Sequence, residues 1–279
     1  MSYDAAYIAK FYDEYGEREW ERLVGRVIDR VNFEVHKRLL DEFVRQGDRV
    51  LEVGAGPGRF TLELARIGAH IVVGDISPGQ LELHAEKTTS VEDAIESRGL
   101  MDVVDLSRYD DERFDATVCY GGAISYVFDH AERAVSELLR VTKPGGPVLM
   151  SVMSTVGTAR AFFWFFPELA ERFGAEANEQ IFKSGLLHGE INNGHNMRMY
   201  RWRELEQLVT RAGGRVVAAS ASNFLSIGNE EVFEADWARY LEWELQACRE
   251  PGALDGGTHI VAVIVRDGAA PSTGAPSTG

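Results

Sequence analysis

The chain has few cysteines and no long apolar run. Two cysteines in 279 residues, Cys119 and Cys248, can form neither a disulfide framework nor a four-cysteine zinc site. The longest unbroken apolar run, residues 161–166, is far shorter than the roughly 20 residues that a membrane span needs. No basic stretch followed by an apolar one stands at the start, so we expect no signal peptide. These absences predict a reduced, cytoplasmic, soluble protein without a membrane partner.

Basic residues are also scarce relative to acidic ones. The 29 Lys and Arg residues against 44 Asp and Glu residues give a formal net charge of −15. A surface so acidic repels phosphate backbones, and we therefore expect no nucleic-acid partner. No group of His, Cys, Asp and Glu has the spacing of metal ligands, so we also expect no metal site.

What the sequence does contain is a regular alternation of apolar runs and helical patterns from residue 49 onward. The runs are residues 49–53, 70–75, 100–104, 114–120, 147–152, 215–221 and 259–265; the main helical patterns are 32–46, 59–65, 78–97, 130–141, 203–212 and 230–248. This alternation is typical of βαβ units. It predicts an α/β fold whose parallel sheet is covered by helices on both faces.

Two segments break this alternation and divide the chain. Residues 1–31 are rich in Tyr, Glu and Arg and are predicted to form an N-terminal helical lid. Residues 154–200 contain the aromatic run and are predicted to form a cap over the mouth of the sheet. The core then comprises residues 32–153 and 201–267. Residues 268–279 repeat Ala-Pro-Ser-Thr-Gly and are predicted to be a disordered tail.

The most informative segment is Val-Leu-Glu-Val-Gly-Ala-Gly-Pro-Gly at residues 50–58. Glycines between a strand and a helix let the backbone turn sharply and approach a ligand, and the N-terminus of the next helix favours an anion. Asp75 ends the following strand, where a carboxylate can accept hydrogen bonds from both hydroxyls of a ribose. Together these features predict a nucleotide-like ligand.

The spacing of the glycines bears on which nucleotide-like ligand binds. A dinucleotide fingerprint has its third glycine one residue later, where this chain has Arg59. The loop instead resembles motif I of the class I S-adenosylmethionine-dependent methyltransferases, Glu/Asp-x-Gly-x-Gly-x-Gly. The resemblance covers about residues 35–152 and includes Asp75, the pair Asp105-Leu106 after the expected third strand, and residues 114–120 and 138–146. The chain is also similar to bacterial natural-product methyltransferases, including those that methylate carbon 3 of indoles.

This resemblance implies a fold and a cofactor. The fold is a Rossmann-like, seven-stranded mixed sheet of order 3-2-1-4-5-7-6, in which the last strand runs antiparallel beside the fifth. The cofactor is S-adenosylmethionine, which leaves as S-adenosylhomocysteine. The implied ligands are Glu52 at the loop; Gly54, Ala55 and Gly56 around the methionine moiety; Asp75 and Gln80 at the ribose; Ile76, Asp105 and Leu106 at the adenine; and Tyr120 beneath the sulfonium.

Three residues are candidates for catalytic roles beside the acceptor. His195 lies in a segment that in related folds returns to the sheet next to the acceptor, and a histidine there can take a proton near neutral pH. His36 lies four residues after Asn32, so both can face the pocket from one side of a helix. Tyr15 in the lid is a candidate for orienting the acceptor. The competing interpretations are a solvated loop histidine and, for the aromatic run 161–166, simple packing of the cap.

The sequence therefore predicts an enzyme that methylates a small, aromatic or indole-containing metabolite by in-line displacement. Two alternatives stay open, an NAD(P)-dependent oxidoreductase and a non-catalytic S-adenosylmethionine-binding protein. Residues 120–123 lack the Asn/Asp-Pro-Pro-Tyr/Phe motif of DNA amino-methyltransferases. C-, N- and O-methylation all stay open, as does the oligomeric state, for which the sequence allows a homodimer.

Overall fold

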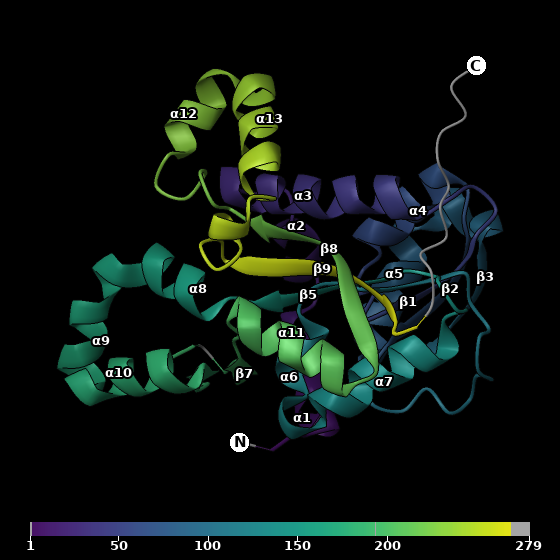
Figure 1. Ribbon diagram of the computed structural model, residues 1–279, viewed down its shortest axis with the longest axis horizontal. Coiled ribbons are helices and arrows are strands. Elements are labelled where there is room, and N and C mark those ends of the chain that lie inside the picture. Colours follow the sequence, from purple (N-terminus) through teal and green to yellow (C-terminus); the bar gives the residue numbers. More distant parts are fainter. Residues whose placement is uncertain (1, 193, 269–279) are drawn as a thin grey trace.

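A seven-stranded mixed sheet forms the centre of the computed structural model, which describes residues 2–192 and 194–268 (Figure 1). The strands are β1 (Arg49–Val53), β2 (His70–Asp75), β3 (Ile95–Leu100), β4 (Ala116–Cys119), β5 (Val148–Met153), β8 (Gly214–Ser222) and β9 (His259–Arg266). Their order is β3-β2-β1-β4-β5-β9-β8, and β9 runs antiparallel to both of its neighbours. Because β8 and β9 are the sixth and seventh core strands along the chain, the order expected from the resemblance is confirmed.

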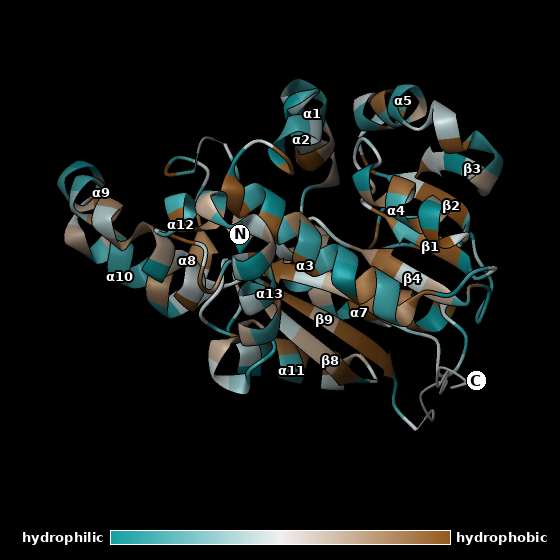
Figure 2. Cartoon of the chain, turned by 90° about the horizontal axis from the view of Figure 1, so that it is seen from above, coloured by the Kyte–Doolittle hydropathy of each residue, from teal (hydrophilic) through white to brown (hydrophobic). Residues whose placement is uncertain are grey.

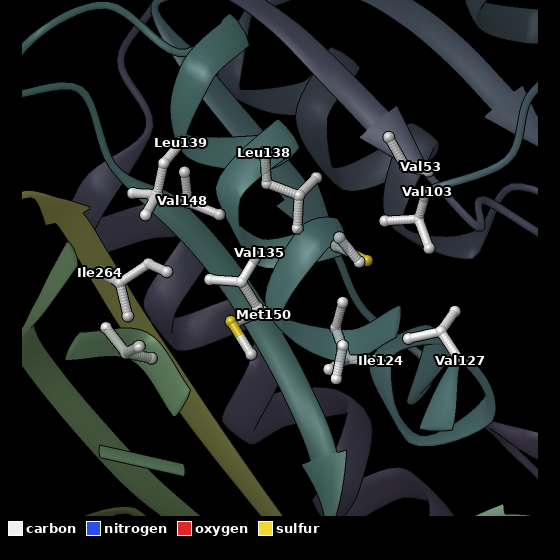
Figure 3. Packing of buried hydrophobic residues seen from close by; sticks show 14 of the residues in the cluster. Val53, Val103, Ile124, Val127, Val135, Leu138, Leu139, Val148, Met150 and Ile264 are labelled. Carbon is white, nitrogen blue, oxygen red and sulfur yellow. The ribbon is translucent and has the colours of Figure 1, made fainter. Parts of the chain in front are cut away.

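Helices cover both faces of this sheet, as the alternation predicts. One face carries α3 (Val27–Phe43), α4 (Arg59–Ile67) and α13 (Trp237–Ala247), and the other carries α6 (Ala123–Tyr126), α7 (Ala131–Val141) and α11 (Trp202–Arg211). Figure 3 shows Val135, Leu138 and Leu139 of α7 packed near Val148 and Met150 of β5. Fully burying an aliphatic side chain of this size contributes about 1.5–3 kcal/mol. The sheet is thus a rigid platform for the loops at its edge.

The third strand lies earlier in the chain than expected. The segment predicted as one helix, residues 78–97, contains α5 (Pro78–Lys87), the 3-10 helix η1 (Thr89–Ala94) and the first half of β3. β3 is an edge strand with a polar, largely exposed sequence, so it lacks the apolar run that marks an inner strand. The apolar residues Met101, Val103 and Val104 instead form a buried turn after the strand ends. This shift moves the loop that follows β3 and changes which residues reach the site.

Two helices also differ from their predicted bounds. α3 begins at Val27 because the Asp29 side chain accepts a hydrogen bond from the Arg26 backbone and so caps the first turn. Asn32 therefore lies inside α3, buried against β8. The predicted helix 230–248 is two helices, α12 (Glu230–Ala235) and α13, because Asp236 leaves the helical conformation and caps the second.

The lid and the cap stand at the carboxyl edge of the sheet. The lid consists of α1 (Ala5–Tyr15) and α2 (Arg18–Arg22). The cap consists of α8 (Thr155–Phe162), the 3-10 helix η3 (Phe163–Phe165), α9 (Phe166–Phe173), α10 (Ala175–Ser184) and the short strands β6 (Leu186–Leu187) and β7 (Met197–Arg198). Figure 2 shows α9 and α10 extending beyond the end of the sheet.

The remaining short elements are η2 (Phe128–His130) and η4 (Pro251–Ala253). Of the predicted disordered tail, residues 269–279 lie outside the described residues. Within residues 2–192 and 194–268, no helix combines the length and the hydrophobicity that crossing a bilayer would take.

Candidate active site

The glycine loop joins β1 to α4 at the carboxyl edge of the sheet. Gly56 and Gly58 both have positive φ angles, 53° and 93°, which L side chains rarely adopt. A Cβ atom on Gly58 would also lie 2.5 Å from the Thr88 methyl group, so the position has no room for a side chain. The loop is therefore held in one tight conformation that exposes its backbone to a ligand.

Asp75 at the end of β2 fixes this loop. Its Oδ2 accepts a hydrogen bond from the Gly56 N–H at 2.8 Å, and its Oδ1 accepts one from the Ser77 N–H at 2.9 Å. Burial raises the pKa of the Asp75 carboxyl to about 6. Each carboxylate oxygen can accept a second hydrogen bond. Asp75 lines the pocket beside the loop, so it can hold two ribose hydroxyls as expected.

Gln80 has a free acceptor next to Asp75. Its Nε2 donates to the backbone carbonyls of Tyr12 and Gly16 and so ties the lid to α5. Its Oε1 is buried without a hydrogen-bond partner, and a Cβ atom on Gly56 would lie 3.9 Å from it. An unpaired buried carbonyl costs free energy that a donor from a ligand would offset. This geometry supports the expected contact with the ribose.

The cofactor pocket is small because the lid lies across it. The pocket encloses about 80 Å³ and is lined by the lid residues Tyr3, Ile8, Tyr12 and Glu19 together with Val53, Gly54, Gly56, Asp75, Ile76, Gln80, Met101, Asp102, Val103, Tyr120, Gly121, Ala123, Tyr126 and Val127. Ligand pockets usually enclose roughly 300–1,000 Å³. We therefore expect the lid to shift outward when an adenosyl group binds.

Asp105 and Leu106 do not reach this pocket, contrary to the expectation for the adenine. Asp105 is exposed and its carboxylate accepts from the Ser107 N–H, while the Leu106 N–H already donates to Glu137 Oε2 at 2.8 Å. Asp102 and Val103 line the pocket instead. The reason is the earlier end of β3, since Leu100 is in register with Asp75. Asp102 and Val103 thus take the place at the adenine that the resemblance gave to Asp105 and the backbone amide of Leu106.

Glu52 lies under the glycine loop at the end of a chain of hydrogen bonds. The Thr61 hydroxyl donates to Glu52 Oε2 at 2.6 Å, and the ring of His84 contacts Thr61 through Nε2 at 2.8 Å. Arg98 Nε donates to His84 Nδ1, so Nδ1 is unprotonated and Nε2 carries the proton. Burial raises the pKa of Glu52 to about 8. Glu52 is thus neutral at pH 7 until a cation, such as the amino group of a cofactor, approaches.

Tyr120, Ile76 and Ala55 are all placed at this edge of the sheet. Tyr120 and Ile76 line the cofactor pocket, and Ala55 lines a hollow of about 30 Å³ beside it. Tyr120 is buried and packs edge-on against the rings of His36 and Phe60, at 4.6 and 5.0 Å between centroids. These contacts fix the position of its ring, and a place beneath the sulfonium stays a prediction.

His36 does not face an open site, contrary to the prediction. It is 3% exposed, lines none of the cavities described here, and donates from Nδ1 to the Asn32 carbonyl at 2.7 Å. Burial lowers its pKa to about 4, so the ring is neutral. Its contact with Tyr120 makes it a packing residue. The helix periodicity correctly turned His36 inward but could not show which side chains would cover it.

A second, larger cavity of about 590 Å³ lies between the sheet and the cap. Many of its walls are apolar or aromatic; they include Tyr15, Met153, Phe162, Phe165, Phe166, Leu169, Phe182, Leu187, Ile191, Met197 and Met199. This volume is in the range of small-molecule sites. Phe162, Phe165 and Phe166 of the aromatic run therefore line this cavity, which we call the acceptor cavity after the role proposed for it below.

His195 and Tyr15 both line the larger cavity, and their catalytic roles stay predictions. The His195 ring lies 3.8 Å from that of Phe11 and 6.3 Å from that of Tyr15, measured between centroids. Tyr126 contacts His195 Nδ1 at 3.5 Å, whereas Nε2 is buried without a partner. Burial lowers the pKa of His195 to about 4 and keeps the ring neutral.

The two cavities meet at four residues, Tyr12, Glu19, Gly121 and Tyr126. Glu19 forms a two-point ion pair with Arg22, including a 2.9 Å hydrogen bond from Nε to Oε2. A Cβ atom on Gly56 would lie 3.6 Å from Glu19, so this pair stands directly over the glycine loop. Glu19, Arg22 and Tyr126 were not predicted from the sequence. The only signal for Glu19 and Arg22 was the concentration of charged and aromatic residues in the lid.

The buried histidines predict how stability depends on pH. Burial lowers the pKa to about 4 for His36, His84 and His195, and to about 3 for His259. An unfolded histidine titrates near 6.5, so between about pH 4 and 6.5 the unfolded chain binds up to four more protons. Their stabilising contribution is therefore present above pH 6.5 and is lost as the pH falls.

The two buried carboxyls act in the opposite direction. In the folded chain Asp75 keeps its proton to about pH 6 and Glu52 to about pH 8, whereas both lose it at lower pH in the unfolded chain. Their contribution to the free energy of unfolding is therefore lost as the pH rises. Between pH 4.5 and 6, the unfolded chain binds up to four more protons at its histidines, and the folded chain keeps up to two more at its carboxyls. The unfolded chain therefore binds a net two protons more, and the free energy of unfolding changes by at most about 2–3 kcal/mol per pH unit. Urea unfolding of the cofactor-free protein is expected to show maximal stability near pH 6.5, a steep loss toward pH 5 and a shallow loss toward pH 8. A maximum at pH 8 or above would contradict these burial assignments.

Among the described residues, no cluster of three or more His, Cys, Asp and Glu side chains is placed to hold a metal ion. Cys119 and Cys248 are both buried, and burial raises the pKa of the Cys119 thiol to about 12. Thiolate chemistry therefore has no place in this site.

Comparison with known proteins agrees with this geometry. Residues 50–146 match a protein family described as a methyltransferase domain. The chain is 37% identical to a demethylmenaquinone methyltransferase of Clavibacter sepedonicus over 109 residues, which are 39% of this chain and 42% of that protein. It is 33% identical to a ubiquinone biosynthesis O-methyltransferase of Alkalilimnicola ehrlichii over 109 residues, 39% of this chain and 43% of the other. The chain thus spans about half the length of the curated relatives it matches.

A solved structure shares the fold over more of the chain. The 1,6-didemethyltoxoflavin-N1-methyltransferase of Burkholderia thailandensis, solved with S-adenosylhomocysteine, superposes with a TM-score of 0.57 at 15% identity, covering 94% of this chain and 88% of that one. The region that matches the family begins in β1 and includes the glycine loop, Asp75 and the turn after β3. Residues 50–146 therefore match a methyltransferase domain within a Rossmann-like fold, and the cofactor that this match indicates is S-adenosylmethionine.

Proposed function

We propose that this chain transfers a methyl group from S-adenosylmethionine to a small, aromatic or indole-containing acceptor held under the cap. The observation that carries the proposal is the meeting of the cofactor pocket and the acceptor cavity at Tyr12, Glu19, Gly121 and Tyr126. A cofactor seated on the glycine loop would direct its methyl group toward this junction. The names of two relatives, a demethylmenaquinone methyltransferase and a ubiquinone biosynthesis O-methyltransferase, also favour an aromatic acceptor.

The chemistry is an in-line displacement. The bond from sulfur to the methyl carbon breaks while a bond from that carbon to the acceptor atom forms, and the sulfonium becomes a neutral thioether. A proton then leaves the acceptor, and the proposed receiver is the neutral ring of His195, which packs against Tyr126 beside the junction. Aligning the two reactants and excluding water can supply several kcal/mol of the barrier reduction. The lid and the cap provide both functions.

A turnover assay tests this proposal. Purified protein is incubated with S-adenosylmethionine and a panel of indoles, phenols, hydroquinones and amines, and the release of S-adenosylhomocysteine is measured by mass spectrometry. At least one aromatic acceptor is expected to be methylated. Tight binding of S-adenosylhomocysteine with no turnover of any compound would favour the non-catalytic alternative.

Replacing His195 with Ala is expected to lower turnover about 10- to 100-fold while leaving the affinity for S-adenosylhomocysteine within twofold. The physical reason is that His195 lines the acceptor cavity but not the cofactor pocket. Steady-state kinetics and calorimetry check the two quantities separately. Full activity of the variant would remove His195 as the proton acceptor.

A further inference from the structure

His259 lies in the acceptor cavity and was not singled out by the sequence. It is the first residue of β9 and pairs with Met153, the last residue of β5. Its ring is therefore at the carboxyl edge of the sheet, on the wall of the cavity that the sheet forms opposite the cap. Both His259 and Thr258 line the cavity.

A hydrogen-bond network fixes which nitrogen of His259 carries the proton. The Thr258 hydroxyl oxygen lies 3.0 Å from His259 Nδ1, 3.1 Å from Asn223 Oδ1 and 3.5 Å from the Ser222 carbonyl. The last two atoms can only accept, so the single hydroxyl proton points to them. The hydroxyl must then accept the third bond, and His259 Nδ1 is its donor.

The orientation of Asn223 supports this assignment. Its Nδ2 donates to the Ile28 carbonyl at 2.7 Å and to Ser226 Oγ at 3.1 Å, which leaves Oδ1 as the group that faces Thr258. Asn223 also has a φ of 64°, a left-handed conformation that is uncommon outside glycine. Asparagine adopts this conformation more readily than most residues, and here it presents Oδ1 as an acceptor to Thr258.

With Nδ1 protonated, His259 Nε2 has a lone pair and no hydrogen-bond partner among the described residues. Burial, the neighbouring His36 ring at 6.3 Å and the positive charge of Arg22 lower the pKa of His259 to about 3. The ring is therefore neutral at pH 7, as is that of His195, and its Nε2 can accept a hydrogen bond. What remains is a rigid hydrogen-bond acceptor in the cavity wall.

The cap side of the cavity presents further unpaired polar atoms. Thr155 Oγ1, Thr158 Oγ1 and Asn178 Oδ1 are buried without partners, although all three residues line the cavity. The orientation of Asn178 is fixed because its Nδ2 donates to the Phe166 carbonyl at 2.9 Å. Asn178 Oδ1 and the unprotonated His259 Nε2 can only accept a hydrogen bond, whereas the two hydroxyls can accept or donate. A largely apolar cavity with these groups matches an aromatic molecule that carries hydrogen-bond donors at its edge.

On the basis of the proposed function, we infer that His259 Nε2 accepts a hydrogen bond from an N–H or O–H group of the methyl acceptor. The acceptor class is then an aromatic with such a donor, of which indole is the simplest nitrogen example. His259 touches the substrate and sets specificity, while His195 receives the proton. Thr258 and Asn223 act through His259 as positioning residues.

Histidine tautomers give a test that does not depend on activity. In the full chain labelled with ¹⁵N-histidine, His259 is expected to show a protonated Nδ1 and an unprotonated Nε2, whereas His84 shows the reverse and serves as an internal reference. Adding indole is expected to shift the His259 Nε2 resonance, and adding 1-methylindole, which has no N–H, is not. A protonated Nε2, or equal shifts with both probes, would overturn the inference.

Kinetics supply the second test. The wild-type protein is expected to prefer an indole over its 1-methyl counterpart about tenfold in kcat/KM, the usual loss when a buried acceptor is left unpaired. His259→Phe, which keeps a ring of similar shape, should abolish this preference by slowing only the N–H substrate. Equal loss for both substrates would mean a structural role and would sink the inference. Absence of any turnover would count against the proposed function, and the resonance shifts would still decide the role of His259.

Discussion

Replacing Asp75 with Ala is expected to weaken the binding of S-adenosylhomocysteine by about 1–3 kcal/mol, or about 5- to 150-fold. The substitution removes the acceptors of two ribose hydroxyls and also leaves the Gly56 and Ser77 N–H groups without their partner. Both losses act on the same loop, so the effect should exceed that of any other single carboxylate in the pocket. Isothermal titration calorimetry measures it directly.

Asp102 and Asp105 provide matched controls for this experiment. Both are acidic residues in the turn after β3, but only Asp102 lines the pocket, whereas Asp105 is exposed. Asp102→Ala should weaken binding, and Asp105→Ala should leave it unchanged. Unchanged affinity in Asp75→Ala would remove Asp75 from the site, and a loss in Asp105→Ala alone would restore the assignment made from the sequence.

The second large effect is expected for Gly157→Ala, where α8 crosses the loop before β9. A Cβ atom at Gly157 would lie 1.6 Å from the Gly257 carbonyl oxygen and 2.3 Å from its carbonyl carbon. Backbone atoms cannot rotate away, so the helix or the loop must move. Although alanine favours a helix by about 1 kcal/mol over glycine, overpacking of this kind typically costs 1–3 kcal/mol and occasionally more. The net expectation is a loss of at least about 1 kcal/mol.

Chemical unfolding of Gly157→Ala checks this expectation, with Gly252→Ala as its control. A Cβ atom at Gly252 meets nothing within 4 Å and the residue has no positive φ, so its substitution should change stability by less than about 0.5 kcal/mol. Because α8 forms part of the acceptor cavity, Gly157→Ala should also impair acceptor binding more than cofactor binding. Equal stability of the two variants would contradict the close crossing.

The cofactor side of the site could largely be predicted from the sequence because its signals are local. Glycines 54, 56 and 58, Asp75 and Tyr120 lie within or directly after strands that apolar runs mark clearly. Asp102 was missed for one physical reason: β3 is a polar edge strand, and the apolar turn after it imitates a strand. An error of a few residues in one strand end is enough to exchange Asp102 for Asp105.

The acceptor side could not be predicted to the same degree because it depends on contacts between distant segments. Arg22 and His259 are 237 positions apart in the chain and meet only in the folded cavity. The prediction that His36 faces inward was correct, but its burial beneath Tyr120 depends on how α3 packs on β4. Periodicity reports which face of a helix is buried and says nothing about the partner it meets.

The most direct test of the central claim is a crystal structure of the full chain with S-adenosylhomocysteine. The methionine moiety should lie on the backbone of residues 54–56, with the ribose at Asp75, the adenine between Ile76 and Asp102, and the sulfur directed to the junction at Gly121 and Tyr126. Density for the ligand elsewhere, or an empty glycine loop in crystals saturated with it, would contradict the account.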